Sequence, residues 1–88
     1  MKIETKGTYD KSYANLGKSY KSLTKETMEL FIENPHHPAL RNHPLDPPLE
    51  RYRSISIDDY LRILFRMIDP STALFLKIGK HDEIYERI

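Results

Sequence analysis

A histidine near the end of the chain directly follows a run of strand-forming residues at positions 73–80. Successive residues of a strand point to opposite faces of the sheet. One face should therefore carry an aromatic ring, a cation, a bare stretch of backbone and the histidine, namely Phe75, Lys77, Gly79 and His81. The other face should carry three aliphatic side chains, Leu74, Leu76 and Ile78. Because an imidazole titrates near neutral pH, the pattern predicts a packed sheet whose open face handles an anion.

Arginines on the preceding strand, residues 61–68, add cations to the same face. The core side of this strand should hold the apolar side chains of Leu61, Ile63, Phe65 and Met67. Arg62 and Arg66 alternate with them, so they should lie on the open face beside Lys77. A planar guanidinium binds phosphate through two hydrogen bonds; the alternative is a solvated cross-strand ion pair. Arg53 should instead point to the core side at the start of its strand, within reach of the loop that holds His43.

Two of these segments resemble a family of bacterial toxins. Residues 61–66, LRILFR, and 78–85, IGKHDEIY, are similar to the C-terminal half of the RelE/ParE superfamily. The resemblance is strongest to its YafQ-like branch, whose chains end in a Gly-x-His-x-x-x-aromatic pattern. Residues 41–45, RNHPL, and 52–54, YRS, are similar to the loop and the following strand of that branch. The likeness extends over residues 35 to 85, and the N-terminal third agrees in length and in the order of its helices.

The resemblance implies the toxin of a type II toxin–antitoxin system, an endoribonuclease that cleaves ribosome-bound mRNA. In such enzymes the ribose 2′-hydroxyl attacks the adjacent phosphate without a metal or any other cofactor. The implied catalytic residues are His43, Arg62, His81 and Tyr85, and the implied RNA-binding residues are Arg53, Arg66, Lys77 and Lys80. His43 and His81 would move protons, Arg62 would stabilise the transition state, and Tyr85 could stack on a nucleobase. The implied partners are mRNA, the ribosome and a cognate antitoxin laid over the open face.

Each candidate also has a structural interpretation. His81 could cap a terminal turn or bond to Asp82, Tyr85 could be a packing residue, and His43 could be a solvated loop histidine. A metal site made by His36, His37 and His43 is disfavoured, because no carboxylate accompanies them at a helical spacing.

One departure from the family pattern concerns the strand at residues 53–57. The YafQ-like pattern has a histidine and an aspartate there, whereas this chain has Ser56 and Tyr60; Asp59 could substitute only if the turn shifts by one residue. Serine cannot act as a base at neutral pH, so activity would have to rely on His43, His81 and Arg62. Two other functions therefore stay open. One is a ParE-like toxin that blocks DNA gyrase by protein binding, and the other is an interaction module or toxin relic without chemistry.

The elements that must position these residues form a simple series. A short strand at residues 1–5 should precede a helix with Thr8 as its N-cap, ending near Gly17. A second helix should run from Ser19 or Ser22 to Glu33, followed by a proline-rich loop without regular structure at residues 35–48. Strands follow at residues 53–57, from Leu61 and up to His81, with a hairpin turn at residues 69–72. The expected fold is α+β and RelE-like, β-α-α-β-β-β, an antiparallel sheet with a two-helix hairpin on one face.

Composition limits the setting and the partners. Eighty-eight residues predict a single domain, residues 1–88, with no cysteine to form a disulfide or a thiolate metal site. We expect a cytoplasmic protein, because there is no signal-peptide pattern and no apolar run of about 20 residues. The net charge is +1, from 14 basic and 13 acidic residues, which is low for a protein that must neutralise many phosphates. Six lysines lie in residues 1–25, whereas residues 26–50 hold five acids against Arg41.

Overall fold

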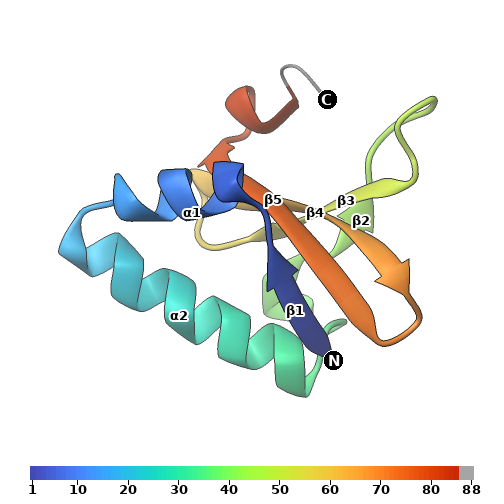
Figure 1. Cartoon of the computed structure of the whole chain (residues 1–88), viewed down its shortest axis with the longest axis horizontal. Coiled ribbons are helices and arrows are strands. Elements are labelled where there is room, and N and C mark those ends of the chain that lie inside the picture. The colour runs from blue at the N-terminus through green and yellow to red at the C-terminus, as the bar shows by residue number, and fades with distance from the viewer. Residues whose placement is uncertain (86–88) are drawn as a thin grey trace.

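The computed structural model describes residues 1–85, which form a sheet with two helices against it (Figure 1). The elements along the chain are β1 (Lys2–Thr5), α1 (Gly7–Ala14), α2 (Lys18–Glu33), the 3-10 turn η1 (Pro38–Leu40), β2 (His43–Pro44), β3 (Tyr52–Ser56), β4 (Leu61–Asp69), β5 (Thr72–Lys80) and the 3-10 turn η2 (Glu83–Tyr85). This confirms the predicted α+β class and the order of the main elements. Within the described residues, no helix is both long enough and apolar enough to span a bilayer.

The sheet is mixed, not wholly antiparallel as the sequence led us to expect. Its strand order is β1-β5-β4-β3-β2, and β1 pairs in parallel with β5 whereas the other neighbours are antiparallel. The parallel pair arises because the last strand of the sheet inserts between the first strand and β4. Parallel neighbours need a long crossover between them, and here the two helices and three strands supply it.

A β-bulge interrupts β5 and changes which side chains share a face. Leu64 on β4 pairs with Lys77, but the next residue, Phe65, pairs with Phe75, so Leu76 is an extra residue without a direct partner. An extra residue of this kind makes two consecutive side chains point to the same face. Leu76 and Lys77 therefore both lie on the face of Leu64.

The bulge corrects the predicted faces of β5. Phe75 was expected beside Lys77 on the open face, but it is fully buried in the core on the helical side. Ile78 belongs to that core, as expected for the apolar face, but Leu74 and Leu76, which were expected beside it, lie on the opposite face with Arg66 and Leu64. The prediction assumed that side chains alternate strictly between the two faces. The extra residue Leu76 breaks that alternation, so the residues before and after it no longer follow one pattern. Gly79 keeps its predicted place beside Lys77, since both lie beyond the bulge.

The carbonyl group of the bulged residue is bound by the first helix. The Thr8 hydroxyl donates a hydrogen bond to the main-chain oxygen of Leu76. Thr8 is therefore not the N-cap that the sequence predicted, because α1 begins at Gly7, and Lys6, two residues before Thr8, holds the N-cap position without a side-chain cap bond. This contact fixes α1 against β5 at the point where the ladder is irregular.

Three phenylalanines form the centre of the core between the sheet and the helices. Phe31 from α2, Phe65 from β4 and Phe75 from β5 are fully buried, with ring centroids 5.2 to 5.8 Å apart. Tilted and edge-to-face pairs at such distances stabilise a fold beyond their buried area, by about 0.5–1.5 kcal/mol each. The apolar side predicted for β4 is confirmed, because Ile63 and Phe65 are buried in this core and Leu61 and Met67 pack against it.

The proline-rich segment is more regular than predicted. The loop at residues 35–48 contains η1 and the edge strand β2, which pairs with β3 through His43 and Pro44. Leu40 anchors η1 in the core, and Arg41 follows it in a left-handed conformation with φ of 49°. Proline is tolerated in an edge strand because one side of the strand needs no ladder bond. This short strand fixes the position of His43.

Candidate active site

The strand register arranges residues of the face opposite the helices in rows that cross the sheet, and two of these rows contain His43 and Arg62. The first row crosses four strands and contains His43, Ser54, Leu64 and Lys77. The second row contains Ser56, Arg62 and Gly79. Rows on one face lie two residues apart, which corresponds to about 7 Å along the strands. His43 and Arg62 thus share a face but not a row.

Three of the four predicted catalytic residues line one pocket of about 370 Å³. His43 contributes from β2, and His81 and Tyr85 contribute from the segment after β5, which returns over the sheet. The remaining wall comes from Pro44 of β2 and from the loop that follows, at residues 45–47 and 49. The two histidines are far apart in sequence and lie on the same side of the sheet. Arg62 does not line this pocket.

The two histidines have different hydrogen-bond partners. His43 Nδ1 lies 2.7 Å from the carbonyl oxygen of Arg41. A carbonyl can only accept, so this contact places a proton on Nδ1 and leaves Nε2 of a neutral ring available as a base. His81 Nδ1 lies 3.5 Å from the Tyr85 hydroxyl, at the long limit of a hydrogen bond. Both histidine side chains are exposed, so protons can exchange with water at either ring.

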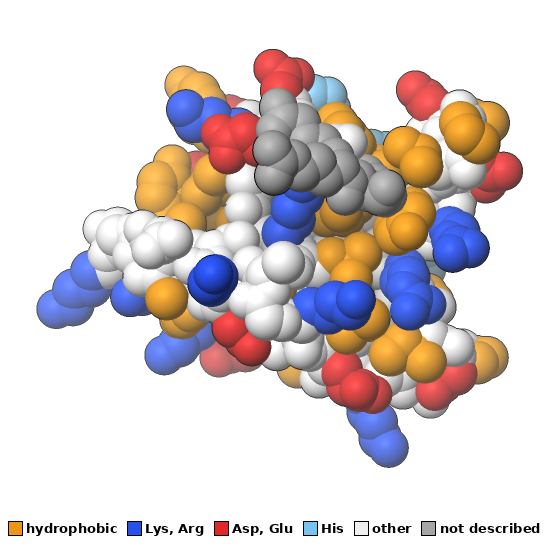
Figure 2. All heavy atoms as spheres, turned by 45° about the horizontal axis from the view of Figure 1, so that its top comes forward, with side chains coloured by type: hydrophobic (Ala, Val, Ile, Leu, Met, Phe, Trp, Pro, Cys, Tyr) orange, Lys and Arg blue, Asp and Glu red, His pale blue; other side chains and the backbone are white. Residues whose placement is uncertain are grey.

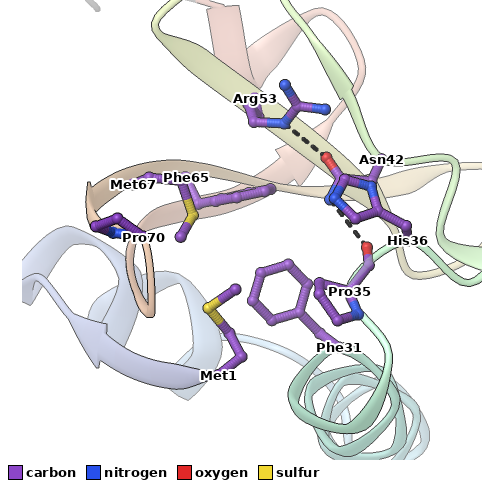
Figure 3. Close-up of a pocket in the computed structure, with 9 residues that line it drawn as sticks. All are labelled: Met1, Phe31, Pro35, His36, Asn42, Arg53, Phe65, Met67 and Pro70. Atoms are coloured by element: carbon purple, nitrogen blue, oxygen red, sulfur yellow. Dashed lines mark hydrogen bonds between the residues drawn. The ribbon is translucent and has the colours of Figure 1, made fainter.

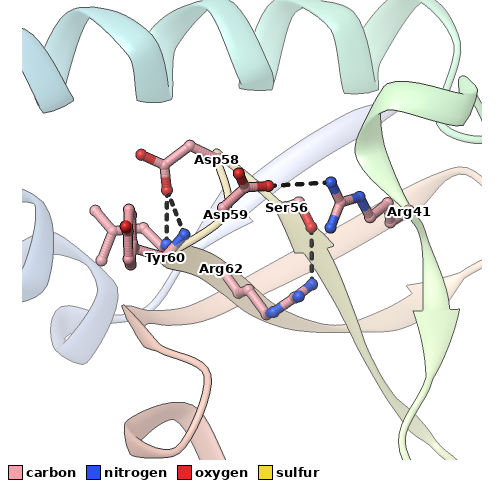
Figure 4. A network of polar contacts seen from close by, with 7 residues as sticks. Arg41, Ser56, Asp58, Asp59, Tyr60 and Arg62 are labelled. Carbon is pink, nitrogen blue, oxygen red and sulfur yellow. Dashed lines mark hydrogen bonds and ion pairs between the residues drawn. The ribbon is translucent and has the colours of Figure 1, made fainter.

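Arg62 is held by a serine on the neighbouring strand. Its Nη1 donates to Ser56 Oγ at 2.7 Å (Figure 4). Its Nε is buried and has no hydrogen-bond partner within residues 1–85. The residue opposite it on β5 is Gly79, where a Cβ would come within 3.3 Å of side-chain atoms of Glu83 and Ile84. The turn η2 thus packs directly over the row that contains Arg62.

Apolar side chains cover the centre of this face. The prediction that this face is uncovered is therefore wrong for its centre. Leu45, Leu64 and Ile84 are buried together, and four half-buried residues pack against them, namely Leu49, Tyr52, Leu76 and Tyr85. Ile84 is fully buried because η2 folds back, and Lys77 Nζ donates to the main-chain oxygen of Glu83 at 2.8 Å. The pocket of His43 and His81 lies at the margin of this cluster, since Leu45, Leu49 and Tyr85 belong to both.

The charges around the pocket are unevenly distributed. Asp46 lines it, whereas none of its described lining residues is a lysine or an arginine. Arg66 lies on the same face of the sheet in a third row, between Tyr52 and Leu74. On the side of the molecule in view in Figure 2, Lys and Arg side chains lie between hydrophobic ones. Arg62 and Arg66 thus lie on the same face of the sheet as the pocket but do not line it.

Two of the predicted RNA-binding residues lie elsewhere. Arg53 points to the helical side of the sheet, as its position in the strand predicted, and its Nε donates to Asn42 Oδ1 at 2.8 Å. It reaches the loop that holds His43 but not the pocket. Lys80 lies beside α1 in a separate pocket with Ser12 and Asn15. Arg66 and Lys77 do lie on the open face.

The acidic residues after β3 take structural roles. Asp59 forms an exposed ion pair with Arg41 at 3.2 Å, and Tyr60 is 71% exposed (Figure 4). Asp58 Oδ1 accepts the backbone N–H groups of Tyr60 and Leu61, both at 2.8 Å. Burial raises the pKa of Asp58, but these backbone hydrogen bonds outweigh it and hold the pKa below its usual value. None of these three residues lines the pocket, so the family's missing histidine and aspartate are not replaced there.

No group of three or more metal-ligating side chains is found in the part of the chain that the structure describes. The three loop histidines are separated: His37 Nδ1 accepts the N–H of Ala39, His36 lines a pocket on the helical side, and His43 lines the pocket on the opposite face.

A family model described as the ParE toxin of the type II toxin–antitoxin system, parDE, matches residues 5–85. The chain belongs to this toxin family. The toxin has the fold of YafQ from E. coli strain BL21(DE3), with 21% identity, a TM-score of 0.76, and 94% of this chain and 96% of that chain covered. A YoeB/ParE toxin from Agrobacterium tumefaciens is similar at 14% identity and a TM-score of 0.75, over 92% of this chain and 99% of the other. No curated protein matches the sequence.

YafQ is also known in the E. coli DinJ–YafQ toxin–antitoxin complex. That structure matches the toxin at 22% identity with a TM-score of 0.75, and the match covers 94% of each chain. These likenesses confirm the predicted RelE-like fold.

Proposed function

We propose that this toxin is an endoribonuclease that cleaves mRNA on the ribosome by attack of a ribose 2′-hydroxyl on the adjacent phosphate. The observation that carries the proposal is the pocket that His43, His81 and Tyr85 line together. Two imidazoles in one pocket can supply a base and an acid at neutral pH without a metal. A protein that acted only by binding would not need two histidines from distant segments in one pocket.

In the proposed reaction His43 Nε2 accepts the proton of the 2′-hydroxyl, because its Nδ1 is bonded to a carbonyl group. The 2′ oxygen then bonds to phosphorus, and the bond from phosphorus to the 5′ oxygen breaks. A protonated His81 gives its proton to that leaving oxygen. The products are a 2′,3′-cyclic phosphate and a free 5′-hydroxyl. General acid and base catalysis of this kind contributes about 10²–10⁴-fold in rate.

The other residues of the face would bind the substrate. Tyr85 would stack on a base next to the scissile phosphate, a contact of about 1–3 kcal/mol. Arg62 and Arg66 lie on the same face, in the rows on either side of the row of His43, and would bind the phosphates that flank the cleaved bond. Ser56 in place of a family base and the apolar cover over the sheet both favour a slow nuclease.

We propose an antitoxin as the protein partner. The support is the family, whose members belong to toxin–antitoxin pairs, together with the structural neighbour YafQ in its DinJ complex.

A second function, block of DNA gyrase by protein binding, is favoured by one observation. The Asp46 carboxylate lines the pocket, and none of the described lining residues is a lysine or an arginine. This charge distribution weakens the attraction of the pocket for a phosphate. The experiment below separates the two functions.

The test is to induce the toxin in cells and to map RNA ends by sequencing, alongside His43→Ala, His81→Ala and His36→Gln. The first two substitutions should reduce new RNA ends by about 10²-fold or more. The control His36→Gln changes an exposed imidazole on the other side of the sheet and should leave the ends unchanged. Growth arrest that survives both alanine substitutions, with intact transcripts, would contradict the nuclease and support a protein target.

A further inference from the structure

A second pocket, of about 260 Å³, lies on the side of the sheet that faces the helices (Figure 3). It lies where α2 has ended and the β4–β5 hairpin extends beyond the helix. Its apolar wall consists of Met1, Phe31, Pro35, Phe65, Met67 and Pro70. Two of these rings, Phe31 and Phe65, belong to the core and are fully buried, so they form the floor beneath the pocket.

The polar wall of this pocket is a chain of hydrogen bonds that links three residues. Asn42 Nδ2 donates to the carbonyl oxygen of Pro35 at 2.9 Å, which leaves its Oδ1 to accept from Arg53 Nε at 2.8 Å. Figure 3 shows Arg53 and Asn42 along one side of the space, opposite Met1 and Phe31. The Arg53 guanidinium uses its Nε for this bond. Its two terminal amino groups have no hydrogen bond within residues 1–85. They form the edge that binds a carboxylate through two bonds.

The charge of the pocket is positive. Arg53 and His36 line it, and none of its described lining residues is acidic. A ligand that fits must combine a bulky apolar group, for the wall, with an anion for the guanidinium. The pocket is also separate from the nuclease pocket, because Arg53 and Ser54 are successive strand residues and Ser54 is paired with His43 on the opposite face.

We propose that this pocket receives a segment of the antitoxin in which a bulky apolar side chain enters the cavity and a neighbouring carboxylate pairs with Arg53. The proposal rests on the antitoxin partner proposed above but not on RNA cleavage. A bulky side chain buried in a fitted pocket is the kind of contact that dominates protein association, and a charge pair beside it adds specificity. A cavity of this size suits one large side chain, and its mostly apolar wall favours a protein side chain over a phosphate chain as the occupant. Arg53 is thereby assigned to protein recognition and not to RNA.

The experiment uses 3-phenylpropionate as the probe, with 3-phenylpropanamide as its uncharged isostere. Binding to the ¹⁵N-labelled toxin is followed by amide chemical shifts. The acid should shift the signals of Phe31, Asn42 and Arg53 and should bind about tenfold more tightly than the amide. In Arg53→Met, which keeps an apolar stem, acid and amide should bind equally. Arg51→Met, an exposed neighbour that packs over Tyr52, is the matched control and should keep the difference.

The second arm adds the antitoxin encoded beside the toxin gene to the probe-bound toxin. One equivalent of antitoxin should release the probe, since both occupy the same pocket. Retention of the probe in the antitoxin complex would overturn the proposal and indicate a site for a free small carboxylate. Equal binding of acid and amide to the unmodified toxin, or shifts confined to other residues, would also overturn it, even if Arg53→Met failed to fold. None of these readouts depends on whether the toxin cleaves RNA.

Discussion

The rings of His81 and Tyr85 meet edge to face, with their centroids 4.9 Å apart and their planes at 84°. Both residues come from the segment after β5, so one short turn positions the imidazole and the ring that supports it. The hydroxyl of Tyr85 adds little to this support, because its 3.5 Å distance to Nδ1 is long for a hydrogen bond. The ring itself should therefore be the part of Tyr85 that matters.

Replacement of Tyr85 tests this distinction between ring and hydroxyl. Tyr85→Phe keeps the edge-to-face contact and should retain RNA cleavage within about threefold, since a weak hydrogen bond contributes under about 1 kcal/mol. Tyr85→Ala removes both the contact to His81 and a residue packed on the apolar cluster, and should reduce cleavage by at least about tenfold. Cleavage of a defined RNA by the purified variants measures both. A large loss in Tyr85→Phe would assign the hydroxyl a direct part in proton transfer.

Gly79 is required by the turn that packs over it. A Cβ at this position would lie 3.3 Å from atoms of Glu83 and Ile84. Gly79→Ala should displace η2 and lower the free energy of unfolding by about 1–3 kcal/mol. Gly7→Ala is the matched control, because a Cβ there meets no atom within 4 Å and alanine favours a helix, so stability should rise by about 0.4–1 kcal/mol. Urea denaturation distinguishes them, and equal stability of the two variants would contradict the close packing of η2.

Two buried serines on β3 should respond in opposite ways to replacement by alanine. Ser56 Oγ accepts from Arg62, so Ser56→Ala leaves a half-buried guanidinium without its partner and should lower the free energy of unfolding by about 1–3 kcal/mol. Ser54 Oγ is buried and has no hydrogen-bond partner within the described chain. Ser54→Ala should therefore be neutral or stabilising. Thermal or urea unfolding gives both values, and an equal cost for the two would show that the Arg62 bond does not contribute.

Alkaline pH should weaken the fold through Tyr9. Burial raises the pKa of Tyr9 from 10.0 to about 12, with smaller contributions from Tyr13 and Asp10. The folded state therefore favours the neutral hydroxyl, so this stabilisation is complete below pH 10.0 and is lost as the pH rises toward 12. Tyr9→Phe cannot ionise, and its free energy of unfolding should fall less over this range.

The control for this experiment is Tyr60→Phe, which changes an exposed ring and should keep the slope of the unmodified toxin. Urea denaturation at several pH values from 8 upward gives the slopes. Parallel curves for Tyr9→Phe and the unmodified toxin would remove Tyr9 as the cause.

Elements with strong local signals were predictable. The hairpin between β4 and β5 lies where Asp69 and Pro70 place it, and the Asp69 carboxylate accepts the N–H of Ser71 at 2.8 Å. The bulge at Leu76 was not predictable, because the group that binds its carbonyl is the Thr8 hydroxyl, 68 positions away. Such a contact exists only once the helix and the sheet have packed.

Only part of the candidate site could be predicted from the sequence. His43, His81 and Tyr85 were selected through the family pattern, and the structure brings them to one pocket, although their catalytic roles stay predictions. Arg62 was expected in the same cleft, but Ser56 holds it in the next row. The apolar cover was missed because residues 81–85 contain one strongly apolar aliphatic residue, Ile84, among polar neighbours. Nothing in that local pattern shows that the turn folds back onto Leu64.

The place of β5 in the sheet has a consequence for biosynthesis. β1 is the first strand to leave the ribosome, yet β5, the strand that pairs with it and joins it to β4, is the last one made. A nascent chain therefore carries an unpaired first strand and an incomplete sheet until translation has passed Lys80. The pocket depends on His81 and Tyr85, so it cannot form before residues 81–85 have been synthesised.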